Sequence, residues 1–402
     1  MPLADGLRAL HHDDFRRFFA AQLASQTLSW MQTVAQSWLV LSLTPSPFKL
    51  GLIGALQFAP ILLFSLATGA LADRVEKRRL LVWAQTAFGC QSLLLAGLVA
   101  SGRVEYWHVA VLAFTAGLAS VVDSPARQAL VADMVGRGDI GNAVALNSAS
   151  FNAARIVGPA LGGLIIARWG VVPTFVLNAA GFVVAVAVLL RLRSAGAPRP
   201  GRAGTVLEGI GEGIAYVRRT AEVRLCLGLL LVVSLFVFNF TIYVPLVVRT
   251  VLGLGAEGFG FLMAALGAGA VTGALVVAAL GARRPPLPVM FATATVACLG
   301  LLALGAARAF WAAAGVLFVT GLSGLILVAS CNTLMQLGSP DELRGRVMSL
   351  YILVWGGVFP LGAFMVGAMS ERWGVGRALV VNGTAGLAVV VALAAWWRWR
   401  RS

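Results

Sequence analysis

The sequence predicts an all-α integral membrane protein with twelve transmembrane helices in two halves of six. Of its 402 residues, 59% are hydrophobic, whereas soluble domains are about 45–50% apolar. Its mean hydropathy is +0.88. Apolar runs long enough to cross a bilayer as helices recur along the whole chain. The alternating ten-residue segments of a membrane β-barrel are not visible in it.

Twelve spans follow from where the apolar runs begin and end. They are Phe18–Leu43, Phe48–Leu71, Leu80–Ala100, Trp107–Val122, Ala143–Ala167, Val172–Leu190, Leu225–Val248, Phe259–Leu280, Val289–Ala306, Trp311–Leu334, Val347–Met369 and Ala378–Trp397. No signal peptide is expected before the first span, because Asp5, Asp13 and Asp14 interrupt a positively charged segment.

Lysine and arginine are distributed unevenly between the two sides of these spans. Of the 31 Lys and Arg residues, 23 fall in segments on the side of the termini and 7 on the other side. Cytoplasmic loops of membrane proteins carry this excess of bases. Both termini are therefore expected in the cytoplasm. The net charge of +15 is explained by these bases in the cytoplasmic loops and does not indicate a nucleic-acid partner. The expected partner is the lipid bilayer.

The central loop divides the chain into six spans and six spans. We expect an N-terminal half at 1–193, a cytoplasmic linker at 194–222 and a C-terminal half at 223–402. Leu207, Ile210, Ile214 and Val217 mark one face of an amphipathic helix in the linker. We expect this helix on the cytoplasmic membrane surface.

The two halves share sequence features at a nearly constant offset. Gly69-Ala70-Leu71 recurs as Gly273-Ala274-Leu275, and Pro159 in the fifth span corresponds to Pro360 in the eleventh. Two matching features at almost the same offset indicate an internal duplication. The halves are therefore expected to be pseudo-symmetric.

A charged turn of a few residues joins the second and third spans. Its characteristic residues are Gly69, Asp73, Arg74, Lys77 and Arg78. The turn resembles the loop between helices 2 and 3 of the major facilitator superfamily, with Glu76 in place of the usual glycine. The resemblance implies that Asp73 contacts the start of the eleventh helix, and that Lys77 and Asp123 complete a charge chain. This latch would open as the halves rock apart. For Asp123, a simple helix-end acid is the alternative.

Four further stretches make the resemblance specific to one subgroup of the superfamily. They are Asp123–Leu130, Asn142–Asn147, Arg155–Gly163 and Leu343–Met348. They are similar to a bacterial subgroup of the superfamily that contains the enterobactin exporter and macrolide efflux proteins. The resemblance implies a monomeric, multi-pass protein of the bacterial inner membrane. It also implies proton-coupled export, by alternating access, of a small siderophore-like or drug-like molecule.

The fifth span carries a motif similar to the signature of proton-coupled exporters. Its residues are Arg155, Gly158, Pro159, Gly162 and Gly163. Proline bends the helix because it cannot donate to the carbonyl four residues earlier. Gly158 and Gly162 form a small-residue face that admits another helix closely. The eighth span offers a partner in Gly267, Gly269 and Gly273. A packing helix with no role in transport direction is the alternative.

Arg155 is the only base deep inside a predicted span. Such a charge is costly and by default marks a functional site. No acid lies at comparable depth in another span, which favours neutral or anionic cargo over lipophilic cations. Structural pairing of Arg155 is the alternative. The same lack of acids leaves the proton carrier unassigned.

Polar side chains in the spans are candidates for lining the transport pathway. Those of the first span alternate at spacings of four and three, which places them on one helix face. Lipid would penalise this face, so it should line water or the bundle interior. The candidates are Gln22, Gln26, Ser29, Thr33 and Gln36, together with Asn239, Tyr243, Asn332, Gln336 and Trp355. For each aromatic residue, packing alone is the alternative.

No residue pattern indicates a catalytic site, a metal site or a cofactor. The four cysteines lack C-x-x-C spacing, and the three histidines lie outside the spans. A membrane-embedded enzyme would need acids, histidines or cysteines clustered at one depth. A non-transporting sensor would be expected to carry an added soluble domain. A facilitator-type importer of a small solute remains the main alternative to an exporter of a small-molecule substrate.

Overall fold

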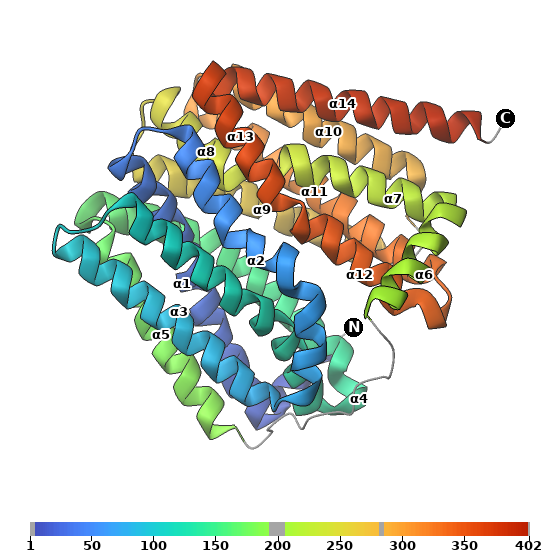
Figure 1. Cartoon of the computed structure of the whole chain (residues 1–402), viewed down its shortest axis with the longest axis horizontal. Helices are drawn as coiled ribbons and strands as arrows, with labels where there is room; N and C mark the ends of the chain where they lie inside the picture. The colour runs from blue at the N-terminus through green and yellow to red at the C-terminus, as the bar shows by residue number, and fades with distance from the viewer. Residues whose placement is uncertain (1–4, 193–205, 281–284, 401–402) are drawn as a thin grey trace. The chain divides into compact units, whose positions relative to one another are not determined.

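The computed structural model describes residues 5–192, 206–280 and 285–400, and these form helices joined by short turns (Figure 1). The helices before the linker are the 3-10 helix η1 (Asp5–His11), α1 (Asp13–Leu43), α2 (Pro47–Arg74), α3 (Lys77–Ala100), α4 (Tyr106–Trp169) and α5 (Val172–Arg191). Those from the linker onward are α6 (Val206–Arg219), α7 (Ala221–Val232), the π-helical η2 (Val233–Val237), α8 (Phe240–Thr250), α9 (Ala256–Leu280), α10 (Leu287–Ala306), α11 (Phe310–Gly338), α12 (Asp341–Gly357), α13 (Phe359–Trp373) and α14 (Val375–Trp399).

Eleven helical segments within the described residues are long and apolar enough to cross a membrane. The remaining predicted span is α1, which has 31 residues. Its glutamines and serines lower its hydropathy, so length alone identifies it as the twelfth span. The all-α membrane fold is confirmed.

Helix α4 differs from the sequence prediction of two spans joined by a loop. Its 64 residues are helical on both sides of a kink at Gly136, and they contain both Pro125 and Pro159. Its one non-helical position is Gly136, with φ 69° and ψ 171°. A positive φ costs glycine little because it has no Cβ. The expected loop is therefore helix that extends both spans and changes direction at a glycine.

The chain forms two compact units, and their boundary cuts through α2. The first unit comprises Met1–Leu43 and Ala59–Ala203, and the second comprises Thr44–Phe58 and Gly204–Ser402. The first half of α2 belongs to the second unit because it packs closely on α13. A Cβ on Gly51 would lie 2.8 Å from the Cα of Gly367.

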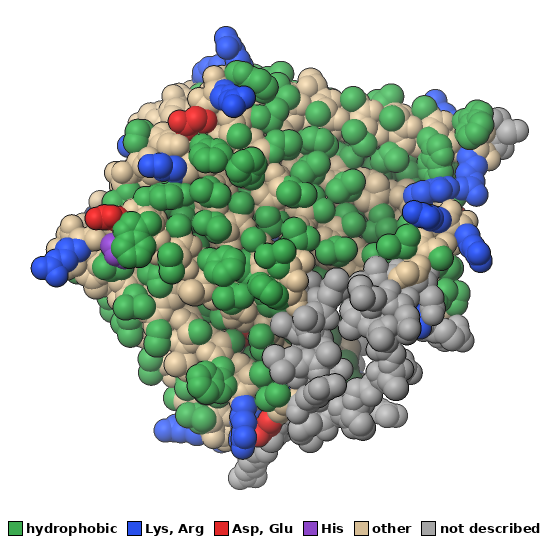
Figure 2. Space-filling model, viewed as in Figure 1, with side chains coloured by type: hydrophobic (Ala, Val, Ile, Leu, Met, Phe, Trp, Pro, Cys, Tyr) green, Lys and Arg blue, Asp and Glu red, His purple; other side chains and the backbone are tan. Residues whose placement is uncertain are grey.

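The first unit has an apolar core where η1, α1, α3, α4 and α5 meet. Phe15, Leu81 and Leu130 are each at most 1% exposed in this core. Outside the cores, large apolar side chains such as Trp83, Leu190 and Val391 are more than 60% exposed. Figure 2 shows apolar side chains covering much of the visible helix surfaces, with Lys and Arg toward helix ends. This pattern suits helices that face lipid.

The linker helix α6 forms where the amphipathic pattern predicts a helix. It packs along α12, and the Tyr216 hydroxyl donates to the Gly338 carbonyl at 2.8 Å. The sequence placed this helix on the membrane surface. The structure shows that α6 also contacts α11 and α12, and its place on the membrane surface stays a prediction.

Candidate functional site

A buried ion pair lies inside the first unit between α3 and α4. Asp123 and Arg127 are one turn apart on α4, and Arg127 Nη2 lies 2.8 Å from both carboxylate oxygens. Their side chains are only 14% and 20% exposed. Gln85 of α3 donates from Nε2 to Asp123 Oδ1 at 2.7 Å. The carboxylate is thus fully engaged and the pair carries no net charge.

The superfamily resemblance implied a charge chain of Asp123 with Lys77, and Arg127 was not among the predicted site residues. The i, i+4 spacing of an acid and a base on one helix was the available signal for Arg127. Lys77 is only 3% exposed, so it also lies inside the protein. Its link to Asp123 stays a prediction.

The charged turn between α2 and α3 is held by Glu76. Its two carboxylate oxygens accept bonds of 3.0 Å from Arg78 and Arg79. Arg78 also donates to the Leu192 carbonyl at 3.0 Å, which ties the turn to the end of α5. The glutamate that departs from the superfamily pattern therefore forms ion pairs with two arginines. The side chains of Gly69, Asp73 and Arg74 lie outside the described residues.

The exporter-like motif packs inside its own unit. A Cβ on Gly158 would lie 2.6 Å from the Cβ of Trp30, and one on Gly162 would lie 3.1 Å from Met31. Both contacts are with α1. The glycine face of α9 is also occupied within its own unit, because Gly269 and Gly273 pack against Phe318 and Leu322 of α11. The expected pairing of these two glycine faces would join the two units, and it stays a prediction.

Arg155 lies on α4 less than one turn before Gly158. Its Nε is buried and has no hydrogen-bond partner among the described residues. No ion pair involving Arg155 is found in that part of the chain either. A guanidinium in a spanning helix without a protein anion is an uncompensated charge, which is costly in a low-dielectric interior.

The polar face of α1 lies in the interior of the first unit. Gln22 and Gln36 are 4% and 8% exposed, and Gln26 accepts a hydrogen bond from Ser150 of α4 at 3.0 Å. Ser29 and Thr33 donate to carbonyls one turn earlier in α1. The face thus contacts the bundle interior, which is one of the two environments that its polarity predicts.

A second polar cluster in this unit was not predicted from the sequence. Gln32 of α1 donates to Gln91 of α3 at 2.8 Å. It accepts bonds of 2.6 Å from both Ser92 of α3 and Asn178 of α5. All four side chains are at most 9% exposed. Polar residues inside apolar spans were the available signal, but spacing along one helix does not reveal partners on others.

In the second unit, the predicted seventh span is interrupted between α7 and α8 by the π-helical turn η2. Asn239 is fully buried beside this break and donates to the Leu235 carbonyl at 2.9 Å. The Tyr243 hydroxyl, also buried, donates to the Phe236 carbonyl at 3.4 Å. The side chains of Asn239 and Tyr243 therefore donate hydrogen bonds to backbone carbonyls at the η2 interruption. Such interruptions often occur at functional sites in membrane helices.

The remaining candidates of the second unit lie on α11 and α12. Gln336 donates to Asn332 at 2.6 Å on one face of α11. The Trp355 ring packs edge-on against Phe238, with centroids 4.9 Å apart. Within the described residues, no three His, Cys, Asp or Glu side chains gather as metal ligands would.

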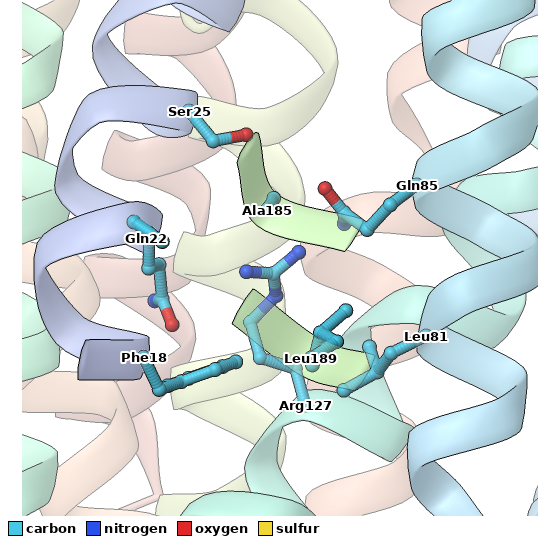
Figure 3. Close-up of a pocket in the computed structure, with 9 residues that line it drawn as sticks. Phe18, Gln22, Ser25, Leu81, Gln85, Arg127, Ala185 and Leu189 are labelled. Atoms are coloured by element: carbon cyan, nitrogen blue, oxygen red, sulfur yellow. The ribbon is translucent and has the colours of Figure 1, made fainter. Parts of the chain in front are cut away.

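A small pocket opens beside the Asp123–Arg127 pair (Figure 3). Its cavity volume is only about 10 Å³, which is room for about one water molecule. Its lining comes from four helices of the first unit. The residues are Phe18, Ala21, Gln22 and Ser25 of α1, Leu81 and Gln85 of α3, Arg127 of α4, and Ala185 and Leu189 of α5.

Comparison with known proteins gives this helical architecture an identity. The family described as "Transmembrane secretion effector" matches residues 4–401, nearly the whole chain. The chain belongs to this family of major facilitator superfamily transporters. The resemblance stated from the loop and exporter-like motifs is confirmed at this level, and the protein is a transporter rather than an enzyme.

Two relatives extend the match over most of their own lengths. The chain is 24% identical to the "Staphyloferrin A transporter" of Staphylococcus aureus, covering 93% of this chain and 94% of the relative. It is 29% identical to the "Multidrug efflux pump Tap" of Mycolicibacterium fortuitum, covering 85% of each. The crystal structure of the nucleoside transporter NupG superposes with a TM-score of 0.79 at 10% identity, over 95% and 99% of the chains. That likeness confirms the fold.

Proposed function

We propose that this transporter is a proton-coupled exporter of a small neutral or anionic organic molecule. Relatives named as a multidrug efflux pump and a staphyloferrin A transporter support export of siderophore-like or drug-like cargo. The excess of bases in the predicted cytoplasmic segments supports a bacterial inner-membrane protein with both termini in the cytoplasm. The two-unit organisation suits alternating access by a monomer.

The observation that carries the cargo assignment is Arg155. Its buried Nε is unpaired within the described chain, while the buried carboxylate of Asp123 is already neutralised by Arg127. The first unit thus offers a cation without an ion-pair partner among the described residues, whereas the carboxylate of Asp123 is held in a pair. Cargo with a negative charge or strong hydrogen-bond acceptors would compensate Arg155, whereas a lipophilic cation would be repelled.

The cargo class can be tested with purified protein in a thermal-shift screen against siderophores, macrolides, lipids and lipophilic cations. Ligand that binds only the folded state raises Tm, because it stabilises that state by RT ln(1 + [L]/Kd). We expect acidic or neutral compounds to raise Tm and lipophilic cations to leave it unchanged. A screen in which only cations stabilise the protein would contradict the proposed cargo class.

We further propose that the charged turn acts as a cytoplasmic latch. Asp73 would accept hydrogen bonds from the exposed N–H groups at the start of α12, whose partial positive charge attracts an anion. Pro340 is the N-cap residue of that helix and forms no side-chain cap bond to these groups. The contact would form in one state of the transport cycle and break in the other.

Asp73→Asn removes this anion with little change in shape. We expect the variant to insert and fold normally but to lose most transport, because the state that needs the latch is no longer stabilised. Transport is measured at matched expression, with membrane insertion checked by protease protection. Wild-type transport by the variant would remove the latch from the mechanism.

A further inference from the structure

We propose that the adjoining ends of α7 and α14 form a binding site for the headgroup of a phospholipid with a net negative charge. The site lies within the second unit, and it depends neither on the cargo nor on the direction of transport. Its centre is the ring of Trp396. The bases around it are Arg218, Arg219, Arg224, Arg398 and Arg400.

Two guanidinium groups contact the Trp396 ring. The Cζ atom of Arg224, from α7, lies 4.7 Å from the ring centroid, and that of Arg400, at the end of α14, lies 6.0 Å from it. A cation over an aromatic face is attracted by the ring. Arg224 also donates from Nη1 to the Arg218 carbonyl at 3.3 Å, which holds the end of α6 beside the ring. These contacts fix bases from separate helices at one place.

Positive charge exceeds negative charge at this end of the second unit. The segments 218–224 and 396–400 contain five arginines and one acid, Glu222. Figure 2 shows Lys and Arg side chains gathered at the right of the view, where α14 ends and α6 meets α7 in Figure 1. The exposed bases are Arg218, Arg219, Arg398 and Arg400. Like charges gathered in this way repel one another, so an anion that contacts several of them would stabilise the arrangement.

The apolar surface next to these bases favours a lipid over a soluble anion. Trp399 is 76% exposed and Val391 is 65% exposed on α14. In a bilayer such side chains face acyl chains, and tryptophan is enriched at the level of the headgroups. The planar fork of arginine matches phosphate oxygens, and basic sites between spanning helices bind anionic headgroups. A ligand that joins a phosphate to acyl chains therefore fits both parts of the site.

The test measures lipid binding by the purified full chain in detergent, with native mass spectrometry as the readout. The probes are dioleoyl phosphatidylglycerol, which has a net negative charge, and dioleoyl phosphatidylcholine, which has the same acyl chains and no net charge. One double variant, Arg224→Gln with Arg400→Gln, removes both charges from the Trp396 ring. A second, Arg218→Gln with Arg398→Gln, removes two bases whose side chains are exposed, so folding should not depend on them.

The matched control is Arg17→Gln with Arg191→Gln, which removes two exposed arginines near helix ends of the first unit. Wild-type protein should bind phosphatidylglycerol more tightly than phosphatidylcholine. Each arginine near an anionic headgroup contributes about fivefold in affinity, so each double variant at the site should weaken phosphatidylglycerol binding about 25-fold. Phosphatidylcholine binding should not change in either variant, and the control should bind both lipids as the wild type does.

Equal affinity of the wild type for the two lipids would overturn the proposal. So would unchanged phosphatidylglycerol binding in the second double variant, or an equal loss in the control, which would show an effect of total charge and no site. Glycerol phosphate is added as a competitor without acyl chains. Its displacement of the lipid would show a site for a soluble phosphate instead. None of these measurements involves transport, so failure of the lipid site would leave the proposed exporter function standing.

Discussion

Replacing Gly158 with leucine should abolish transport. A Cβ at this position would lie 2.6 Å from the Cβ of Trp30 and 3.1 Å from the backbone nitrogen of Met31. The Thr27 carbonyl would be closer still. Because two of these atoms belong to the backbone of α1, no rotamer change can relieve the clash. Overpacking of this kind typically costs about 1–3 kcal/mol or more, and here it would push α1 away from α4.

The measurement compares transport and Tm of Gly158→Leu with those of Gly97→Leu. Gly97 lies on α3, and a Cβ added there would have nothing within 4 Å, so leucine should be tolerated. We expect a lower Tm and no transport for the first variant and near wild-type values for the second. Transport at the wild-type rate by Gly158→Leu would show that α1 and α4 do not need this close approach.

Arg155→Ala should weaken binding of an anionic cargo about tenfold to a hundredfold. A hydrogen bond to a charged group contributes about 1.5–3 kcal/mol, and Arg155 Nε has no hydrogen-bond partner within the described chain. Removing an unpaired buried charge should not destabilise the protein. Insertion and Tm are therefore expected to stay at wild-type level or to improve.

Arg155→Lys should restore binding only in part. Lysine keeps the positive charge but lacks the planar fork of donors that matches a carboxylate. Affinities of the wild type and both variants are measured in nanodiscs with an acidic cargo from the thermal-shift screen. Unchanged affinity together with a lowered Tm in Arg155→Ala would show that Arg155 is a structural residue.

Hydropathy and loop chemistry predict most of this fold because they act locally. The charged turn near Glu76 and the apolar runs on either side place the first helices to within a few residues. The loop expected between the fourth and fifth spans shows where this reasoning fails, because its residues are helical on both sides of the kink at Gly136. Ser124-Pro125 looks like a helix boundary, yet proline is compatible with a continued helix when neighbouring groups satisfy the freed carbonyl.

The interruption at η2 was also not predictable, because the residues around Ser234 and Leu235 are as apolar as the rest of the span. Asn239 and Tyr243 were found as polar residues, but their bonds to carbonyls beside the break depend on the three-dimensional path of the helix.

The candidate site was predictable where residues share a helix and not where they meet across helices. The polar face of α1 follows from spacing alone. The bond from Gln85 to Asp123 joins α3 and α4, and no pattern in either helix specifies it. Arg155 stood out as a deep base, but only the structure shows that its Nε lacks a partner within the described chain.

The central claim, proton-driven export, is tested most directly by the accumulation of an identified cargo in cells with and without a protonophore. Cells that express the protein should accumulate less cargo than cells with the Gly158→Leu variant. The protonophore should raise accumulation to the level of the variant, because it removes the driving gradient. Higher accumulation in expressing cells than in variant cells would contradict export and indicate an importer. Low accumulation that persists with the protonophore would contradict proton coupling.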